Sequence, residues 1–173
     1  FKDSISIINP LLRTGRADYE GEFFSATEAL NLPGGPRRAE GGPPILVGTN
    51  GPKTMRLAAQ FADAWNSDWH HDPSTVLPRL IELDKACEDV GRDPKTIVRT
   101  SGSNVALPGY LGRRANPMEG TNEQIAEQIA AFRDIGLRHW VAGLDPCNSA
   151  KIEEFSKVIE ILDRSELDRS TKE

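Results

Sequence analysis

A four-residue loop made of glycine and polar residues is the segment of this sequence best suited to hold a ligand. The loop, Gly48-Thr49-Asn50-Gly51, follows a short apolar run and precedes Pro52. Proline is favoured at the first position of a helix, so we expect a helix to begin there. The N–H groups of a first helical turn lack intrahelical partners and lie at the positive end of the helix dipole. The loop is therefore a candidate seat for a phosphate, and a tight turn without a ligand is the competing interpretation.

Two further groups of side chains could contact a small molecule. Trp65 and Asn66 end a short predicted strand, where an indole could form the wall of a pocket and an amide could orient a substrate. Tyr110, Arg113 and Arg114 belong to a glycine-containing loop at 107–120, which could act as a lid and meet an anionic group. The structural alternatives are packing by Trp65, turn formation by Asn66 and an ordinary solvated surface loop.

Other polar residues give no catalytic or metal-binding pattern. Adjacent histidines such as His70 and His71 tend to point apart in extended chain, and no third ligand is evident, so we expect a solvated loop there and no metal. We interpret Asp63 as a structural residue at a helix end and Asp145 as the N-cap of the last helix. No Ser/His/Asp grouping or pair of carboxylates stands out, so the catalytic residues are unknown.

A regular series of strands and helices must position these groups. Residues 1–44 form an irregular entry segment, within which apolar spacing predicts a short first helix at 3–14. Residues 164–173 form a polar tail. Between them, residues 45–163 form β/α units, with strands at 45–48, 63–67, 96–106 and 138–144 and helices at 52–62, 74–90, 121–135 and 149–163.

The alternation of strands and amphipathic helices indicates an α/β fold with parallel strands joined by crossover helices. About four β/α units fit one half of a (β/α)8 TIM barrel, and a small doubly wound sheet is the competing architecture. Both place function on the loops that follow the carboxyl ends of the strands. We therefore expect one partial barrel domain over residues 1–173.

Local signals fix the ends and inner faces of several helices. Asp72 precedes Pro73 and should cap the helix at 74–90, and Thr121 and Gln124 form a capping box. The apolar residues expected to face inward on the last two helices are Ile125, Ile129 and Phe132, followed by Ile152, Phe155, Ile159 and Leu162.

Composition narrows the class of protein. The net charge of -5 and a pI of about 5.3 argue against broad binding to nucleic acid, which normally needs a basic face. Two cysteines without a CxxC spacing suit reduced thiols, and no apolar run approaches a membrane span, so we expect a cytoplasmic protein with no membrane partner. The chain begins with Phe1 and lacks an initiator methionine, so we expect a processed chain or a piece of a longer one.

Several segments spread over the chain together resemble one enzyme family. They are Tyr19–Phe24, Gly42–Pro52, Leu57–Asn66, Val90–Pro94, Gly120-Thr121 and Leu144–Pro146. In combination they are similar to the bacterial luciferase-like oxidoreductases, which depend on a flavin or a deazaflavin. The resemblance implies a (β/α)8 barrel of which this sequence is the C-terminal half.

The resemblance also implies a function. It indicates an oxidoreductase, acting as a monooxygenase or dehydrogenase on a small-molecule substrate, with FMN or the deazaflavin coenzyme F420 as its cofactor. The loop at 48–51 would line the flavin pocket, with Trp65 and Asn66 beside it, although Thr49 stands where a glycine is usual. The first four strands of the barrel are absent, so this chain would be a fragment. The alternative is a non-catalytic half-barrel that forms a homo-oligomer or pairs with a missing half.

Overall fold

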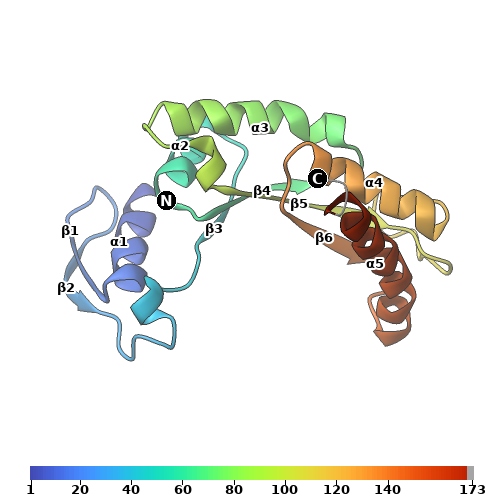
Figure 1. Ribbon diagram of the computed structural model, residues 1–173. Helices are drawn as coiled ribbons and strands as arrows, with labels where there is room; N and C mark the ends of the chain where they lie inside the picture. The colour runs from blue at the N-terminus through green and yellow to red at the C-terminus, as the bar shows by residue number, and fades with distance from the viewer. Residues whose placement is uncertain (171–173) are drawn as a thin grey trace. The chain divides into compact units, whose positions relative to one another are not determined.

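The computed structural model describes the backbone of residues 1–170 and the side chains of residues 1–165. It is an α/β structure (Figure 1). The helices are α1 (Lys2–Arg13), α2 (Pro52–Phe61), α3 (Pro73–Glu88), α4 (Asn122–Asp134) and α5 (Ser149–Ser170), with short 3-10 turns η1 (Arg38–Glu40) and η2 (Pro94–Thr96). The strands are β1 (Arg16–Tyr19), β2 (Ala26–Leu30), β3 (Leu46–Gly48), β4 (Ala64–Trp69), β5 (Val98–Val105) and β6 (His139–Leu144).

The larger sheet contains four strands whose spatial order repeats their order in the chain, β3-β4-β5-β6. A helix follows each of these strands, which confirms the four predicted β/α units. A barrel adds its strands in chain order, whereas a doubly wound sheet reverses direction at a switch point. The unbroken order therefore favours the barrel. β5 and β6 are parallel, in a register that runs from Thr100 opposite His139 to Val105 opposite Leu144.

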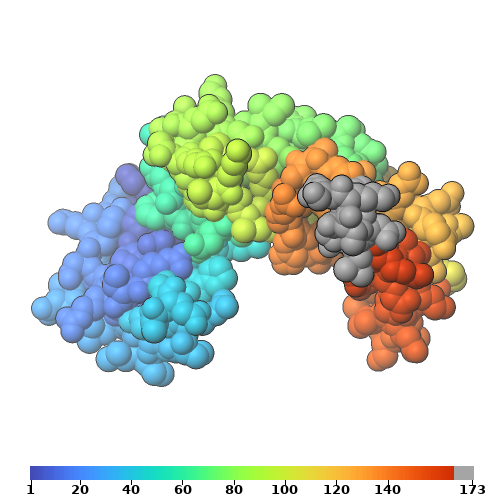
Figure 2. All heavy atoms as spheres, in the orientation of Figure 1, coloured from blue at the N-terminus to red at the C-terminus, as the bar shows by residue number. Residues whose placement is uncertain are grey.

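The chain divides into two compact units. Unit 1 comprises residues 1–65 and 82–97, and unit 2 comprises residues 66–81 and 98–173. In unit 1, β1 and β2 form an antiparallel pair, and buried apolar residues of α2 include Met55, Ala58 and Ala59. In unit 2, α4 and α5 lie side by side (Figures 1 and 2).

Two acidic residues secure the entry segment of unit 1. Asp3 is buried and accepts hydrogen bonds from the N–H groups of Phe23 and Phe24 and from the Tyr19 hydroxyl. Residues 20–25 are therefore held as a turn between β1 and β2. Asp63 forms an ion pair with Arg13 and accepts from the backbone N–H of residue 45, as expected of a structural residue.

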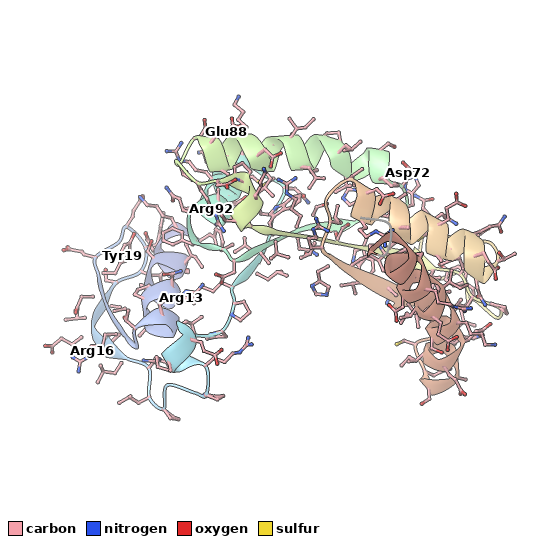
Figure 3. The ribbon with its side chains drawn as sticks, viewed as in Figure 1. Arg13, Arg16, Tyr19, Asp72, Glu88 and Arg92 are labelled. Atoms are coloured by element: carbon pink, nitrogen blue, oxygen red, sulfur yellow. The ribbon has the colours of Figure 1, made fainter. Side chains whose placement is uncertain are left out.

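Helix α2 is anchored at its C-terminal end by a single arginine. Arg92 donates to the carbonyl oxygens of Ala59 and Ala62 at 2.9 and 2.7 Å, and its other guanidinium nitrogens bond to Thr96. The side chain is among those labelled in Figure 3. Cations are favoured near the negative end of a helix, so this contact fixes the position and direction of α2.

Two of the predicted N-caps, those of α3 and α4, are confirmed. The carboxylate of Asp72 accepts from the Ser74 N–H at 2.8 Å, at the start of α3. At α4, Thr121 and Gln124 form the expected capping box, with each side chain bonded to the other residue's backbone N–H. These interactions explain why both helices begin where the sequence predicted.

The last helix differs from its prediction. α5 continues to Ser170, beyond the expected end at residue 163, and the rest of the predicted tail, 171–173, lies outside the described residues. Among the α5 side chains that the structure describes, Phe155 and Val158 are buried, whereas Ile152 is 57% and Ile159 45% exposed. The predicted inner face was therefore wrong for both isoleucines, because α5 packs through a stripe rotated toward Val158. Phe155 stacks on Trp140 of β6.

Candidate functional site

The loop between β3 and α2 has the geometry expected of a helix start without a side-chain cap. Gly51 is the N-cap in an extended conformation, no side chain accepts a hydrogen bond at this cap, and Pro52 is at the first turn. The Gly51 carbonyl accepts from Met55 N at 2.8 Å, which closes that turn. Gly48 and Asn50 are exposed. The first-turn N–H groups are thus not covered by a capping side chain, and the exposed loop leaves an anion room to approach.

Hydroxyl groups stiffen this loop. Thr54 donates to the Gly51 carbonyl at 3.0 Å, and its hydroxyl also contacts the hydroxyl of Thr49. Thr49 is half-buried, so this residue braces the turn from its inner side. The assignment of residues 48–51 to a cofactor remains a prediction.

Trp65 supports the same loop from the core of unit 1. Its side chain is fully buried, and its indole N–H donates to the Thr49 carbonyl at 3.0 Å. In this structure the indole fixes the path of the loop backbone. Direct contact between Trp65 and a cofactor remains a prediction.

Asn66 belongs to unit 2, where both ends of its amide are engaged. Its Nδ2 donates to the hydroxyl of Thr100 on β5, and its Oδ1 accepts from the backbone N–H of Asp68, each at 2.8 Å. Asn66 is the third residue of β4, so these bonds hold the middle of this strand against β5. A role for Asn66 in orienting a substrate stays a prediction.

The loop at 107–120 is tied to the elements that follow it. Asp145, whose side chain is 4% exposed, accepts from the guanidinium and the backbone N–H of Arg113. The hydrogen bonds from Arg113 hold the pKa of Asp145 below its usual value, and the same pairing raises the pKa of Arg113. The expectation that Asp145 caps the last helix was wrong, because Asn148 accepts from Lys151 N at 3.0 Å and performs that role.

The other two loop residues from the sequence prediction contact each other. The Tyr110 hydroxyl accepts from the Arg114 N–H at 3.1 Å and donates to the Arg114 carbonyl. Lys151 of α5 donates to the carbonyl of Pro108, so the loop is attached near its start as well as at Arg113. The proposed lid motion of Tyr110, Arg113 and Arg114 is still a prediction.

Unit 2 contains a cavity of about 400 Å³ at the carboxyl ends of β4 and β5. Arg114 extends across the ring of Trp69, with its guanidinium carbon 5.6 Å from the ring centroid. One guanidinium nitrogen lies 3.4 Å from the amide oxygen of Asn104. The lining residues are Trp69, His70, His71, Asn104, Arg114, Ala115 and Asn116.

Of these lining residues, only Arg114 was predicted from the sequence to contact a ligand. His70 and His71 lie in the loop before α3, as expected, and His71 is exposed. His70 is half-buried, and its two ring nitrogens contact the hydroxyls of Ser67 and Thr75 at 2.7 and 2.8 Å. Over the part of the chain that the structure describes, no three His, Cys, Asp or Glu side chains form a group that could hold a metal ion.

Two glycines carried a signal that could have located the cavity. A Cβ atom on Gly102 of β5 would lie 3.0 Å from the Trp69 ring, and one on Gly143 of β6 would lie 2.9 Å from it. Glycine inside a strand often marks a close approach of another group. Neither glycine needs a positive φ, so the space for Trp69 is what requires them.

The comparison with known families decides the affiliation of the chain. Residues 1–108 match the model of the luciferase-like monooxygenase family, a match that includes the loop at 48–51, Trp65 and Asn66. The chain belongs to this family. The resemblance inferred from sequence segments is thereby confirmed.

Two curated relatives of this luciferase-like protein are a ketoreductase and a dehydrogenase. A phthiodiolone/phenolphthiodiolone dimycocerosates ketoreductase of Mycobacterium sp. is 32% identical over 101 residues, 57% of this chain and 26% of the relative. An F420-dependent glucose-6-phosphate dehydrogenase of Microbacterium testaceum is 33% identical over 92 residues, 53% of this chain and 26% of the relative. The aligned part therefore spans about a quarter of these relatives.

Solved structures give the fold of the luciferase-like chain. An F420-dependent secondary alcohol dehydrogenase superposes with a TM-score of 0.66 at 16% identity, over 92% of this chain and 60% of that one. A riboflavin lyase structure with modified FMN superposes with a TM-score of 0.70 at 13% identity, over 87% and 48%. These neighbours are TIM barrels, so the α/β partial-barrel prediction is confirmed. No helix among the described residues is long and apolar enough to cross a membrane.

Proposed function

We propose that this luciferase-like protein is an oxidoreductase that uses a reduced flavin or deazaflavin, FMN or F420, as a monooxygenase or a dehydrogenase. Family membership supports the general class. Two F420-dependent dehydrogenases and a riboflavin lyase with modified FMN among its relatives and structural neighbours support the two cofactor types. A ketoreductase and an EDTA monooxygenase support the general class of oxidoreductase. The substrate is a small molecule.

The loop at 48–51 is the observation that carries this proposal, because it fits the anionic part of such a cofactor. Its helix start has no side-chain cap, and its N-cap is a glycine in extended conformation. Backbone N–H groups at a helix start bind phosphate without needing a cationic side chain. The Thr49 side chain is turned toward Thr54, which leaves the glycines at either end of the loop to meet the ligand.

The residues of this chain would bind and orient the cofactor. The N–H groups at the start of α2 would hold a phosphate, and Trp65 would keep the loop in place through its bond to Thr49. When bound, a flavin or deazaflavin supplies the hydride-transfer or oxygen chemistry. The protein contributes position and a cavity shielded from water.

The whole protein's site extends beyond this chain in our proposal. The chain covers 26% of each of the two curated relatives above and 60% of a solved neighbour, so other segments of such enzymes complete the barrel. We propose that they supply the catalytic residues. The cytoplasmic location expected from the sequence stays a prediction.

Cofactor titration tests the proposal directly. FMN, F420 and riboflavin would be titrated into this chain and into the longest open reading frame that contains it, with fluorescence and calorimetry as readouts. We expect at least the longer protein to bind FMN or F420, and any FMN binding to exceed that of riboflavin, which lacks the phosphate. If neither protein binds either cofactor, the proposed function is wrong.

A non-catalytic half-barrel that self-associates is the second candidate. Ile152 and Ile159 of α5 favour it, because both are substantially exposed and lie seven positions apart, on one face of the helix. Light scattering would test it over a range of concentrations. Concentration-dependent dimers that disappear when both isoleucines are replaced by lysine would support this candidate, whereas a monomer at all concentrations would exclude it.

A further inference from the structure

We infer that the cavity between Trp69 and Arg114 binds an organic anion, a substrate that carries a carboxylate, sulfonate or phosphate beside an aromatic or apolar body. This inference rests on the proposed function, because it names the chemistry of the substrate. It concerns residues of unit 2 alone.

Arg114 is the charged group that would hold the anion. Its guanidinium lies over the Trp69 ring, so the N–H donors at its edge remain available for a planar partner. The contact with the Asn104 amide oxygen, at 3.4 Å, is long for a charged donor. Among the described residues Arg114 forms no direct ion pair with a carboxylate; Asp145 is paired with Arg113, which lowers the Asp145 pKa more than the nearby charge of Arg114 does.

Trp69 provides the surface for the body of the ligand. The indole is 47% exposed, and the glycine backbones of β5 and β6 lie directly against one part of it. A Cβ on Gly143 would meet Asn104, Trp69 and Arg114 at 2.8, 2.9 and 3.2 Å. The absence of Cβ atoms at these glycines therefore lets the ring lie against β5 and β6, and at Gly143 it also makes room for the guanidinium.

The charge of the lining selects the sign of the ligand. Arg114, His70 and His71 are its ionisable members, and no carboxylate lines the cavity. The amide of Asn104 is partly committed, since its Nδ2 donates to the Ala115 carbonyl at 3.0 Å. A volume of about 400 Å³ falls in the range of small-molecule sites. A bidentate bond between arginine and an oxyanion would then orient the ligand.

The cofactor could also fill this cavity, because FMN likewise joins an aromatic ring system to an anionic group, its phosphate. We assign the cavity to the substrate, because the helix start at residues 48–51 already suits the cofactor's phosphate. If the cavity holds the substrate, FMN should not compete with benzoate, and if it holds the cofactor, FMN should compete. One titration therefore distinguishes the two assignments.

The test uses benzoate and phenyl phosphate as probes and benzyl alcohol as the neutral control. Binding to the 173-residue chain would be followed by NMR through the indole N–H signal of Trp69, assigned with a Trp69→Phe variant. We expect both anions to shift this signal and benzyl alcohol to bind at least tenfold more weakly. Arg114→Gln should weaken anion binding at least tenfold, and Gly143→Ala should weaken it by displacing the ring.

Arg164→Gln is the matched control, because Arg164 is exposed and its side chain bonds to the Glu160 carbonyl of its own helix. It should leave anion affinity unchanged. Equal binding of benzoate and benzyl alcohol, or an Arg114→Gln affinity equal to that of Arg164→Gln, would overturn the inference.

The second part of the test repeats the benzoate titration with saturating FMN, on the longest protein that contains this chain. If benzoate still shifts the Trp69 signal with FMN present, the cavity belongs to a substrate. If FMN competes with benzoate, and Arg114→Gln weakens FMN binding instead, the cavity holds the cofactor and our assignment is wrong. If neither this chain nor the longest protein that contains it binds FMN or F420, while benzoate binding is intact, the proposed function is refuted and the anion cavity still stands.

Discussion

Replacing Gly51 with aspartate should separate cofactor binding from folding. Gly51 is the N-cap of α2 with φ -94° and ψ 146°, a conformation that any N-cap residue adopts. A Cβ at this position would meet only the Thr54 hydroxyl, at 3.4 Å, an ordinary contact. The aspartate therefore fits, and its carboxylate can accept from the first-turn N–H groups that the proposal assigns to a phosphate.

The substitution should raise the stability of the fold and lower the affinity for the cofactor. Aspartate is a slightly better N-cap than glycine, so the free energy of unfolding should rise by a few tenths of a kcal/mol. A carboxylate about 4 Å from a phosphate of charge near −2 is repelled by about 2 kcal/mol, even with the dielectric constant of water. That energy corresponds to roughly a 30-fold loss of FMN affinity.

Gly51→Asn is the matched control, because asparagine has the same shape and capping ability without the charge. Calorimetric titration with FMN and riboflavin, on the longest protein that contains this chain, would measure affinity, and thermal denaturation would measure stability. Gly51→Asp should weaken FMN binding far more than Gly51→Asn does, and riboflavin binding should change little. Equal FMN affinities for the two variants would refute the placement of a phosphate at this helix start.

Three further predictions concern the elements that hold the site. Thr121→Ala removes half of the capping box of α4 and should lower the free energy of unfolding by about 1 kcal/mol in urea denaturation. Arg92→Met removes the donors to the two carbonyls at the end of α2 and should cost about 2 kcal/mol by the same measurement. The hydrogen bond from Phe23 N–H, with those from Tyr19 and Phe24, keeps the pKa of Asp3 below its usual value despite burial. The ionised Asp3 carboxylate should therefore stabilise the fold fully above about pH 4, and this stabilisation should be lost as the pH falls through the lower pKa of the folded state. Thermal denaturation from pH 2.5 to 6 should show a flatter profile for Asp3→Asn.

Features of the fold that depend on neighbouring residues could be predicted from the sequence. The capping box at Thr121, the N-cap at Asp72 and the proline at position 52 each act within one helical turn. The four strands of the larger sheet were located because each apolar run is bounded by turn residues or a helix start. The alternation of these elements then left few possible topologies.

Features that depend on distant residues could not be predicted in the same way. Asp145 lies four residues before the start of α5 and looks like a cap, but Arg113 of the loop at 107–120 takes its carboxylate. The stripe of α5 that packs is set by Trp140 of β6, so spacing alone could not exclude Ile152 and Ile159 from the core. Both outcomes require knowledge of which element lies next to which.

The segments that carry the family resemblance mostly position the candidate site rather than perform its chemistry. Arg92, from the segment at 90–94, fixes the C-terminal end of α2, and Trp65, from the segment at 57–66, holds the loop before its N-terminal end. The cavity residues Trp69, Asn104 and Arg114 lie outside every one of those segments. Because family signals describe how the loop at 48–51 is placed, they bear on the cofactor. The substrate has to be inferred from the cavity itself, which is why the sequence indicated a class of cofactor but no class of substrate.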